Sequence, residues 1–303
     1  MRCFWSNAKK STGKDRLAVY FAGLLGFIRL VGERSVKKYW HVISIGIQNT
    51  LVYRVNFLFR SLFSLVPLLT TLYVWRAIYG SREAGTEIAG YTLAAMSSYY
   101  LVVTLVDALT AVTDDDWQIA ADIKDGNISQ FLVKPIDFLT YRLCLFGANR
   151  VIYTGVALVP TMLFIGWQRQ YFVLPADLVT LGCFMVSLVF TALLQFFISY
   201  TMALLAFWVL DVSAFILMLY ALEFLAGGHV FPINLLPPAL AHALMLTPFP
   251  YQLFFPVSIY LGQVTGTALW QGLAMQVFWV VASYGLARWV WHRGIRKYAA
   301  VGG

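Results

Sequence analysis

Between Asp114 and Phe138 the chain reads DDDWQIAADIKDGNISQFLVKPIDF, the longest polar interruption in a sequence that is otherwise apolar from Phe57 onward. The stretch holds six of the fourteen acidic residues of the chain. Charged groups at this density are costly in the hydrocarbon core of a bilayer, whereas the segments on either side are apolar enough to enter it. We therefore expect apolar spans that cross a membrane, and a loop on one side that a partner contacts.

The composition is that of a membrane protein. Of 303 residues, 60% are hydrophobic and 12% are charged, and the mean hydropathy is +0.72. Soluble domains carry about 25% charged residues. The net charge of +8 does not indicate nucleic acid binding, because eleven of the 22 Lys and Arg residues precede Ser61 and flank the first apolar span. The three cysteines lack the spacing of a metal site or a disulfide framework. We expect no nucleic acid partner and no bound metal.

Six stretches are long and apolar enough to cross a bilayer, which takes about 20 residues of helix. They are Phe57–Tyr79, Tyr91–Val112, Leu143–Trp167, Leu178–Phe207, Val212–Phe231 and Ala268–Trp291. With the N-terminus in the cytoplasm, nineteen Lys and Arg residues fall on the cytoplasmic side and three on the outside, which agrees with the positive-inside rule. The sequence therefore predicts an all-α integral membrane protein with six transmembrane helices and both termini cytoplasmic.

Three parts follow one another along the chain: residues 1–32, 33–56 and 57–303. The first is a basic arm whose apolar run, residues 17–28, resembles a signal peptide. Charged residues follow that run where a small-residue cleavage site would stand, so we expect an uncleaved cytoplasmic arm. The third part is the six-span domain.

The second part is expected to form an N-terminal elbow helix that leads into the first span. Apolar side chains recur at spacings of four, three, four and four from Val36 to Leu51, with Trp40 among them. This pattern is typical of a helix lying in the membrane interface. A helix packed on the protein's own cytoplasmic face would carry the same pattern, and the sequence leaves both arrangements open.

The stretch from Phe224 to Ala287 carries no charged residue but holds six of the ten prolines. Proline removes a helix donor and clashes with the preceding turn, so the pieces between these breaks measure roughly 15–18 Å, too short for a ~30 Å core. We expect a broken, re-entrant pair of short helices in the outer leaflet before the last span. Irregular backbone at that depth has to be covered by protein or line a cavity.

The polar loop contains a short helix signature. Asn127-Ile-Ser-Gln130 has the form of a capping box, and Pro135 ends the element. This predicts a two-turn helix with Ile128, Phe131 and Leu132 on one face. A helix so short is not stable alone and needs a groove. The groove belongs either to a second protein or to the spans of this chain.

Two sets of ionisable residues are candidates for chemistry. Asp122 and Asp125 form a DxxD pattern that could hold magnesium for a prenyl diphosphate, although Asp211 is the one further acidic candidate on that side. The triple aspartate at 114–116 is interpreted as a solvated helix end. Glu223 and His229 lie at or near apolar spans, where such groups are costly and often functional. Glu223 either lines a polar cavity or makes a satisfied hydrogen bond between helices.

Four stretches carry a family resemblance. They are Tyr53–Phe57 through Trp75–Tyr79, Ile123–Ile128 through Phe131–Pro135, Pro232–Pro237 through Pro248–Pro250 to Pro256, and Tyr298–Gly303. Over about residues 35–303 the chain resembles the permease subunit of type-2 ABC exporters, and within them the branch often described as viologen or multidrug exporter permeases. The chain has no GxxxxGK[ST] loop, so it cannot hydrolyse ATP by that chemistry itself.

The resemblance implies a transport subunit of the bacterial plasma (inner) membrane rather than an enzyme. Two copies of a separate ABC ATPase would bind ATP and magnesium, and a second permease, the same or a homologous chain, would complete the translocation path through the lipid. By position, the ATPase-coupling helix comprises Gly126, Asn127, Ile128, Phe131, Leu132 and Pro135. Glu223 and His229 remain the candidates for the translocation cavity.

The aromatic content of 17% suits an amphipathic or lipid-like substrate. Two alternatives remain from other classes of protein. One is a membrane-embedded transferase that uses Asp122 and Asp125, and the other is a membrane anchor that transports nothing.

Overall fold

A computed structural model describes residues 38–52, 54–81, 87–112, 115–133, 136–175 and 177–298. Their regular structure consists of helices, apart from one isolated bridge between Ile88 and Tyr91. The predicted all-α class is therefore confirmed. The expected arm of residues 1–32 and the start of the elbow lie outside the described residues.

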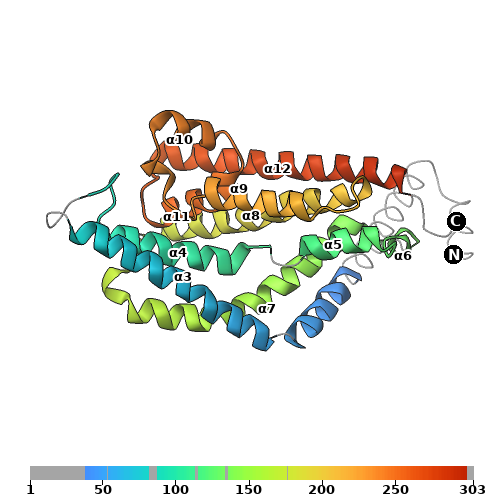
Figure 1. The fold of residues 1–303 in the computed structure, drawn as a ribbon, viewed down its shortest axis with the longest axis horizontal. Coiled ribbons are helices and arrows are strands. Elements are labelled where there is room, and N and C mark those ends of the chain that lie inside the picture. The colour runs from blue at the N-terminus through green and yellow to red at the C-terminus, as the bar shows by residue number, and fades with distance from the viewer. Residues whose placement is uncertain are drawn as a thin grey trace, which may run out of the picture.

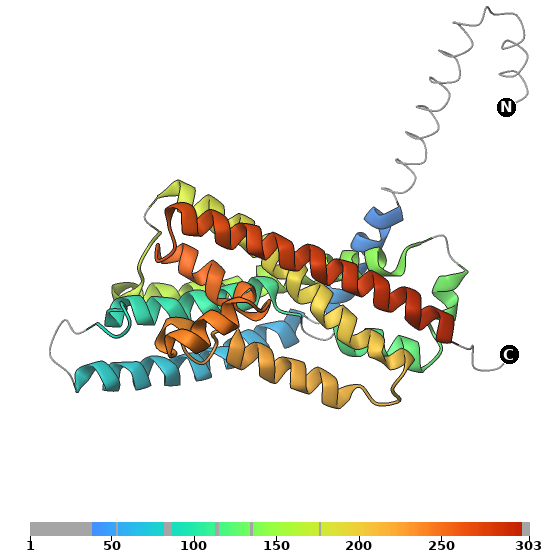
Figure 2. The same ribbon diagram turned by 90° about the horizontal axis from the view of Figure 1, so that it is seen from above.

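Long helices lie side by side along the long axis of the molecule (Figures 1 and 2). They are α3 (Arg54–Gly80), α4 (Leu93–Thr110) followed by α5 (Asp115–Lys124), α7 (Phe138–Trp167), α8 (Leu178–Ala203) with η2 (Leu204–Phe207), and α12 (Gly266–Lys297). Within the described residues, five helical stretches are long and apolar enough to cross a membrane. They correspond to five of the six predicted spans, and the chain is a multi-pass membrane protein.

The remaining predicted span, Val212–Phe231, contains the shorter helix α9 (Ser213–Ala226). Its 14 residues measure about 21 Å, which is less than a ~30 Å hydrocarbon core. Figure 1 shows α9 running toward the end of the bundle where α10 and α11 lie. The six-span topology thus stays a prediction.

Between α9 and α12 the prolines divide the chain as expected. The short elements are η3 (Ile233–Leu235), α10 (Pro238–Met245), η4 (Phe249–Gln252) and α11 (Phe254–Tyr260). Every residue of α11 is buried, and this helix packs against α4 and α8. The prediction of short helices is confirmed, and their depth in the membrane stays a prediction.

The helix over residues 38–52, blue in Figure 1, packs on α7 through small residues. Gly46 and Thr50 are buried, and a methyl group at Gly46 would lie 3.0 Å from the Cβ of Ala148. Trp40 and Leu51, two members of the predicted apolar stripe, are exposed. The helix thus contacts the protein on one face and leaves apolar side chains free on another, which fits an interfacial elbow that stays a prediction.

One further 3-10 turn, η1, completes the regular structure of the described residues. η1 (Arg169–Tyr171) follows α7, and the hydroxyl of Ser98 donates to the carbonyl of Tyr171 at 2.6 Å. α4 lies at the centre of the bundle, because its side chains from Met96 to Val103 are all buried. Its position lets polar groups on α4 contact elements that are distant in the sequence.

Candidate functional site

The predicted short helix exists, but its length and its cap differ from the prediction. α6 (Ser129–Leu132) is a single turn, with Ile128 at its N-cap and no side-chain capping bond. Gly126 has a φ of +79° and ends α5 in a left-handed turn that leads directly into α6. The amide of Gln130 donates to the backbone carbonyl of Asn127 at 3.1 Å. The predicted capping box of Asn127 and Gln130 is therefore wrong, because backbone carbonyls of the turn already accept hydrogen bonds from the amides at the start of α6.

The side chains of this turn point in two directions instead of sharing one face. Ile128 is fully buried, and the ring of Phe131 packs on those of Phe138 and Tyr141 at centroid distances of 5.3 and 4.9 Å. Leu132 is 50% exposed and Val133 is 85% exposed. Ile128 and Phe131 thus anchor the turn to the rest of the protein, while Leu132 and Val133 face outward. Asn127 is exposed, and Pro135 lies outside the described residues.

Contacts from α12 brace this loop. The hydroxyl of Tyr298 donates to the carbonyl of Gly126 at 3.1 Å. Arg288 forms an ion pair of 2.5 Å with Asp137, and the rings of Phe138 and Trp291 stack at 5.0 Å. These contacts tie the loop to the last long helix.

The carboxylate of Asp137 also caps α7. Its Oδ2 atom accepts from the amide of Thr140 at 3.0 Å. Burial opposes ionisation, but the hydrogen bonds from Thr140 and Arg288 outweigh it and lower the pKa of Asp137. Asp137 is thus held as an anion that joins α7 to α12.

The two aspartates of the DxxD pattern have different surroundings. Asp122 is ion-paired with Arg142 of α7, and Asp125 is exposed at the end of α5. Across the described ranges, no three His, Cys, Asp or Glu side chains are grouped to hold a metal ion. Asp122 instead joins α5 to α7.

The interpretation of the triple aspartate as a solvated helix end is wrong for its two described members. Asp115 and Asp116 are buried in the first turn of α5, because α5 starts inside the bundle. Asp116 Oδ2 accepts from the hydroxyl of Tyr220 at 2.5 Å, and Asp115 Oδ1 accepts from the side-chain amide of Asn149 at 3.4 Å. The positive end of a helix dipole also favours carboxylates there. Asp114 lies outside the described residues.

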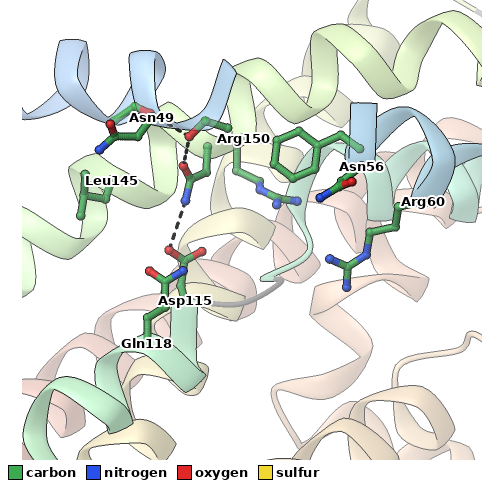
Figure 3. A pocket seen from close by; sticks show the side chains of 11 residues that line it. Asn49, Asn56, Arg60, Asp115, Gln118, Leu145 and Arg150 are labelled. Atoms are coloured by element: carbon green, nitrogen blue, oxygen red, sulfur yellow. Dashed lines mark hydrogen bonds between the residues drawn. The ribbon is translucent and has the colours of Figure 1, made fainter. Parts of the chain in front are cut away.

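Asp115 lines a polar pocket of about 580 Å³ between the 38–52 helix, α3, α5 and α7. Figure 3 shows Arg150, Asn56 and Arg60 gathered on one side and Asp115 with Gln118 on another. Dashed lines in Figure 3 mark the hydrogen bonds that link Thr50, Asn149 and Asp115. The pocket thus lies beside the 38–52 helix and the first turns of α3.

A second cavity, of about 520 Å³, adjoins the first and shares Arg60 and Arg150 with it. Its walls come from α3, α4, α7 and the end of α9, and they include the ionisable pair Asp107 and His229. Asp107 Oδ1 lies 3.2 Å from His229 Nε2. The two cavities together form a polar region that extends from the elbow toward the middle of the bundle.

The two predicted cavity residues have different positions. His229 lines the second cavity, whereas Glu223 Oε1 accepts from the side-chain amide of Gln252 at 3.1 Å. Glu223 thus makes the interhelical hydrogen bond that the sequence left open as its alternative role. Arg60 and Arg150 were not predicted as cavity residues, because in the sequence each looks like an ordinary positive charge at the cytoplasmic end of a span. The sequence also could not pair Asp107 with His229, which are 122 positions apart.

A family model described as "ABC-2 family transporter protein" matches residues 65–302. The match covers most of α3 and every later element, including the loop with α6 and the Asp107–His229 pair, and it begins after the 38–52 helix. Comparisons with curated proteins and with solved structures give no match.

Proposed function

Because the chain belongs to the ABC-2 transporter family and is therefore a membrane subunit of an ABC transporter, we propose that it exports an amphipathic or lipid-like substrate. Two copies of a separate ATPase, which bind ATP and magnesium, would drive it. A second permease, the same or a homologous chain, would complete the translocation path. The proposal places the complex in the bacterial plasma membrane with both termini cytoplasmic.

The observation that carries this proposal is the geometry of α6. Leu132 and Val133 project from a turn that Ile128 and Phe131 lock to the protein. Two exposed apolar side chains on a rigid turn suit a hydrophobic groove in a partner. The turn can transmit a push because Asp137 and Arg288 tie its base to α12. We therefore assign contact with the ATPase to Leu132 and Val133, and we assign Ile128 and Phe131 a positioning role.

The polar cavities support the substrate class. Arg60, Arg150, Asp107 and His229 supply charged or polar groups, while Leu68, Val103 and Phe224 supply apolar walls to the same space. A molecule with a polar head and an apolar body can satisfy both kinds of wall. No comparable observation favours either alternative. Asp122, which the transferase would use, is paired with Arg142. Nothing similar supports a membrane anchor that transports nothing.

The proposal is tested by purifying the tagged full chain from its native membrane and identifying what remains bound. We expect an ATPase with a GxxxxGK[ST] loop in near-stoichiometric amount. The double variant Leu132→Ala/Val133→Ala should lose it. The control Val209→Ala/Leu210→Ala, two exposed apolar residues in the turn before α9, should retain it.

Two results would contradict the proposal in different ways. Recovery of the wild-type chain alone, intact and monodisperse, would argue against a transporter driven by a separate ATPase. If the Leu132/Val133 variant retained the ATPase at the wild-type level, the proposal of an ATPase-driven transporter would stand, but the assigned contact would be refuted.

A further inference from the structure

A groove of about 630 Å³ lies between η2 and the last turns of α12, outside the polar cavities and outside the loop that carries α6. Its cationic residues are Arg293, Arg296 and Lys297, all exposed. Trp208 and Trp289 form its aromatic sides and are 40% and 57% exposed. Leu205 and Val290 complete the lining. Three positive charges therefore meet beside aromatic and aliphatic surface.

The charges of the groove suit an anion. No Asp or Glu is among the described residues that line it. The nearest acidic residue in sequence to Trp208, Asp211, accepts a hydrogen bond from the amide of Ser213 and is not part of the lining. The guanidinium of Arg293 lies 5.4 Å from the centre of the Trp289 ring, which orients it along the wall while its N–H groups can still donate.

An apolar track leads from the cations along one face of α12. Phe278, Val281, Gly285 and Trp289 follow one another at spacings of three, four and four residues, and Arg293 continues the row. The three side chains of this track are more than half exposed, and a methyl group at Gly285 would meet nothing within 4 Å. The glycine therefore leaves a dent between Val281 and Trp289 in which a flexible chain can lie.

The groove is fixed by close packing at its floor. Gly294 is buried, and a methyl group there would overlap the ring of Phe207 in η2. This close approach sets the separation of α12 and η2. The site therefore exists before a ligand arrives, which reduces the entropic cost of binding.

We propose that this groove binds an anionic phospholipid, with the phosphate at Arg293, Arg296 and Lys297 and an acyl chain along the track on α12. The order of groups along the helix matches the layers of a bilayer leaflet: cations at headgroup level, tryptophan at the interface, then apolar side chains. An acidic protein segment would satisfy the cations but leave the track uncovered.

The test uses the purified full-length protein in detergent, titrated with phosphatidylglycerol or phosphatidylcholine whose acyl chains carry bromine. Bromine quenches nearby tryptophan, and subtraction of the Trp289→Phe variant isolates the signal of Trp289. We expect half-quenching at a lower concentration of phosphatidylglycerol than of phosphatidylcholine. Arg293→Gln/Arg296→Gln should raise the phosphatidylglycerol midpoint roughly thirtyfold, because each cation contributes a factor of about five.

The control Lys38→Gln/Lys124→Gln removes the same charge from exposed residues outside the groove and should leave the midpoint unchanged. Gly285→Leu keeps every charge, fills the dent at an exposed helical position and should raise the midpoint. Equal midpoints for the two lipids would overturn the proposal. A midpoint shift in the lysine control as large as that in the Arg293→Gln/Arg296→Gln variant would also overturn it. Complete displacement of the lipid by inorganic phosphate would also overturn it and would indicate a site for free anions.

Discussion

The loop between α5 and α7 contains the single turn α6, and the segment between α9 and α12 contains several short helices. None of these helices would be stable alone, yet different forces hold the two regions. The loop is held by the ion pairs Asp137–Arg288 and Asp122–Arg142, and by ring contacts at Phe131. Within the segment, α11 is held by burial, since every one of its residues is buried, whereas α10 has no buried residue. The loop is thus a surface element tied to the bundle, and α11 is part of the core.

Hydrogen bonds reinforce the same contrast. The buried side chain of Gln276 on α12 donates to the carbonyl of Tyr251 in η4 at 2.9 Å, and the hydroxyl of Tyr99 on α4 donates to the carbonyl of Gly228 at 2.6 Å. These bonds satisfy carbonyl groups that the broken helices leave free. The proline-rich segment is therefore bonded directly to α4 and α12.

The largest effect should come from α11, the buried helix of the segment. Phe255 is 1% exposed, and its ring is pressed against Gly272 of α12. Phe255→Ala should lower the free energy of unfolding by about 3–5 kcal/mol, because it leaves a cavity in the core. Unfolding of the detergent-solubilised protein measures this loss. Phe278→Ala, which truncates an exposed phenylalanine on α12, is the control and should change stability by less than about 1 kcal/mol.

A loss of stability in the Phe278 control as large as that in the Phe255 variant would mean that burial does not distinguish the two positions. Equal stability of both variants and wild type would show that α11 contributes nothing to the stability of the core. Either result would contradict the conclusion that burial holds α11 in place.

A smaller effect is expected from Phe131 in the loop. Its ring packs on Phe138 and Tyr141, so Phe131→Ala should loosen the turn of α6 and speed amide exchange there roughly tenfold, or about 1.4 kcal/mol. Leu132→Ala truncates an outward-facing side chain and should leave exchange unchanged. Hydrogen exchange read by mass spectrometry distinguishes the two. Faster exchange in the Leu132 variant alone would show that the anchoring and outward-facing roles are reversed.

The sequence predicted the features that depend on composition and length. Apolar runs of about 20 residues predicted six spans, five of which correspond to long helices, and the prolines from Pro232 to Pro256 predicted a break into short ones. These signals are local, since each depends on the residues of the segment itself. The existence of a short helix near Ser129 was predicted for the same reason.

Features that depend on partners far along the chain were not predicted. The cap at Asn127 failed because a left-handed turn at Gly126 supplies the amides of α6 with backbone acceptors. Asp115 and Asp116 were assigned to solvent because nothing local indicates that Tyr220 and Asn149 lie beside them. A single sequence does not show such contacts, so the cavity with Asp107 and His229 emerged from the tertiary structure alone.

The smallest effect separates the ionic contribution to the loop from the apolar one. The Asp137–Arg288 pair is about one third exposed on both sides, so solvent screening limits its contribution to less than about 1 kcal/mol. Arg288→Gln should lower stability by that amount at neutral pH. The pKa of Asp137 is depressed below its ordinary value of 3.8, so its stabilising effect is present above that pH and is lost as pH falls through the folded-state value. The stability difference between wild type and variant should therefore shrink below about pH 3.8. A difference that stays constant through that range would mean that Arg288 acts through packing instead of charge, and the loop would then be held by the same forces as the buried segment.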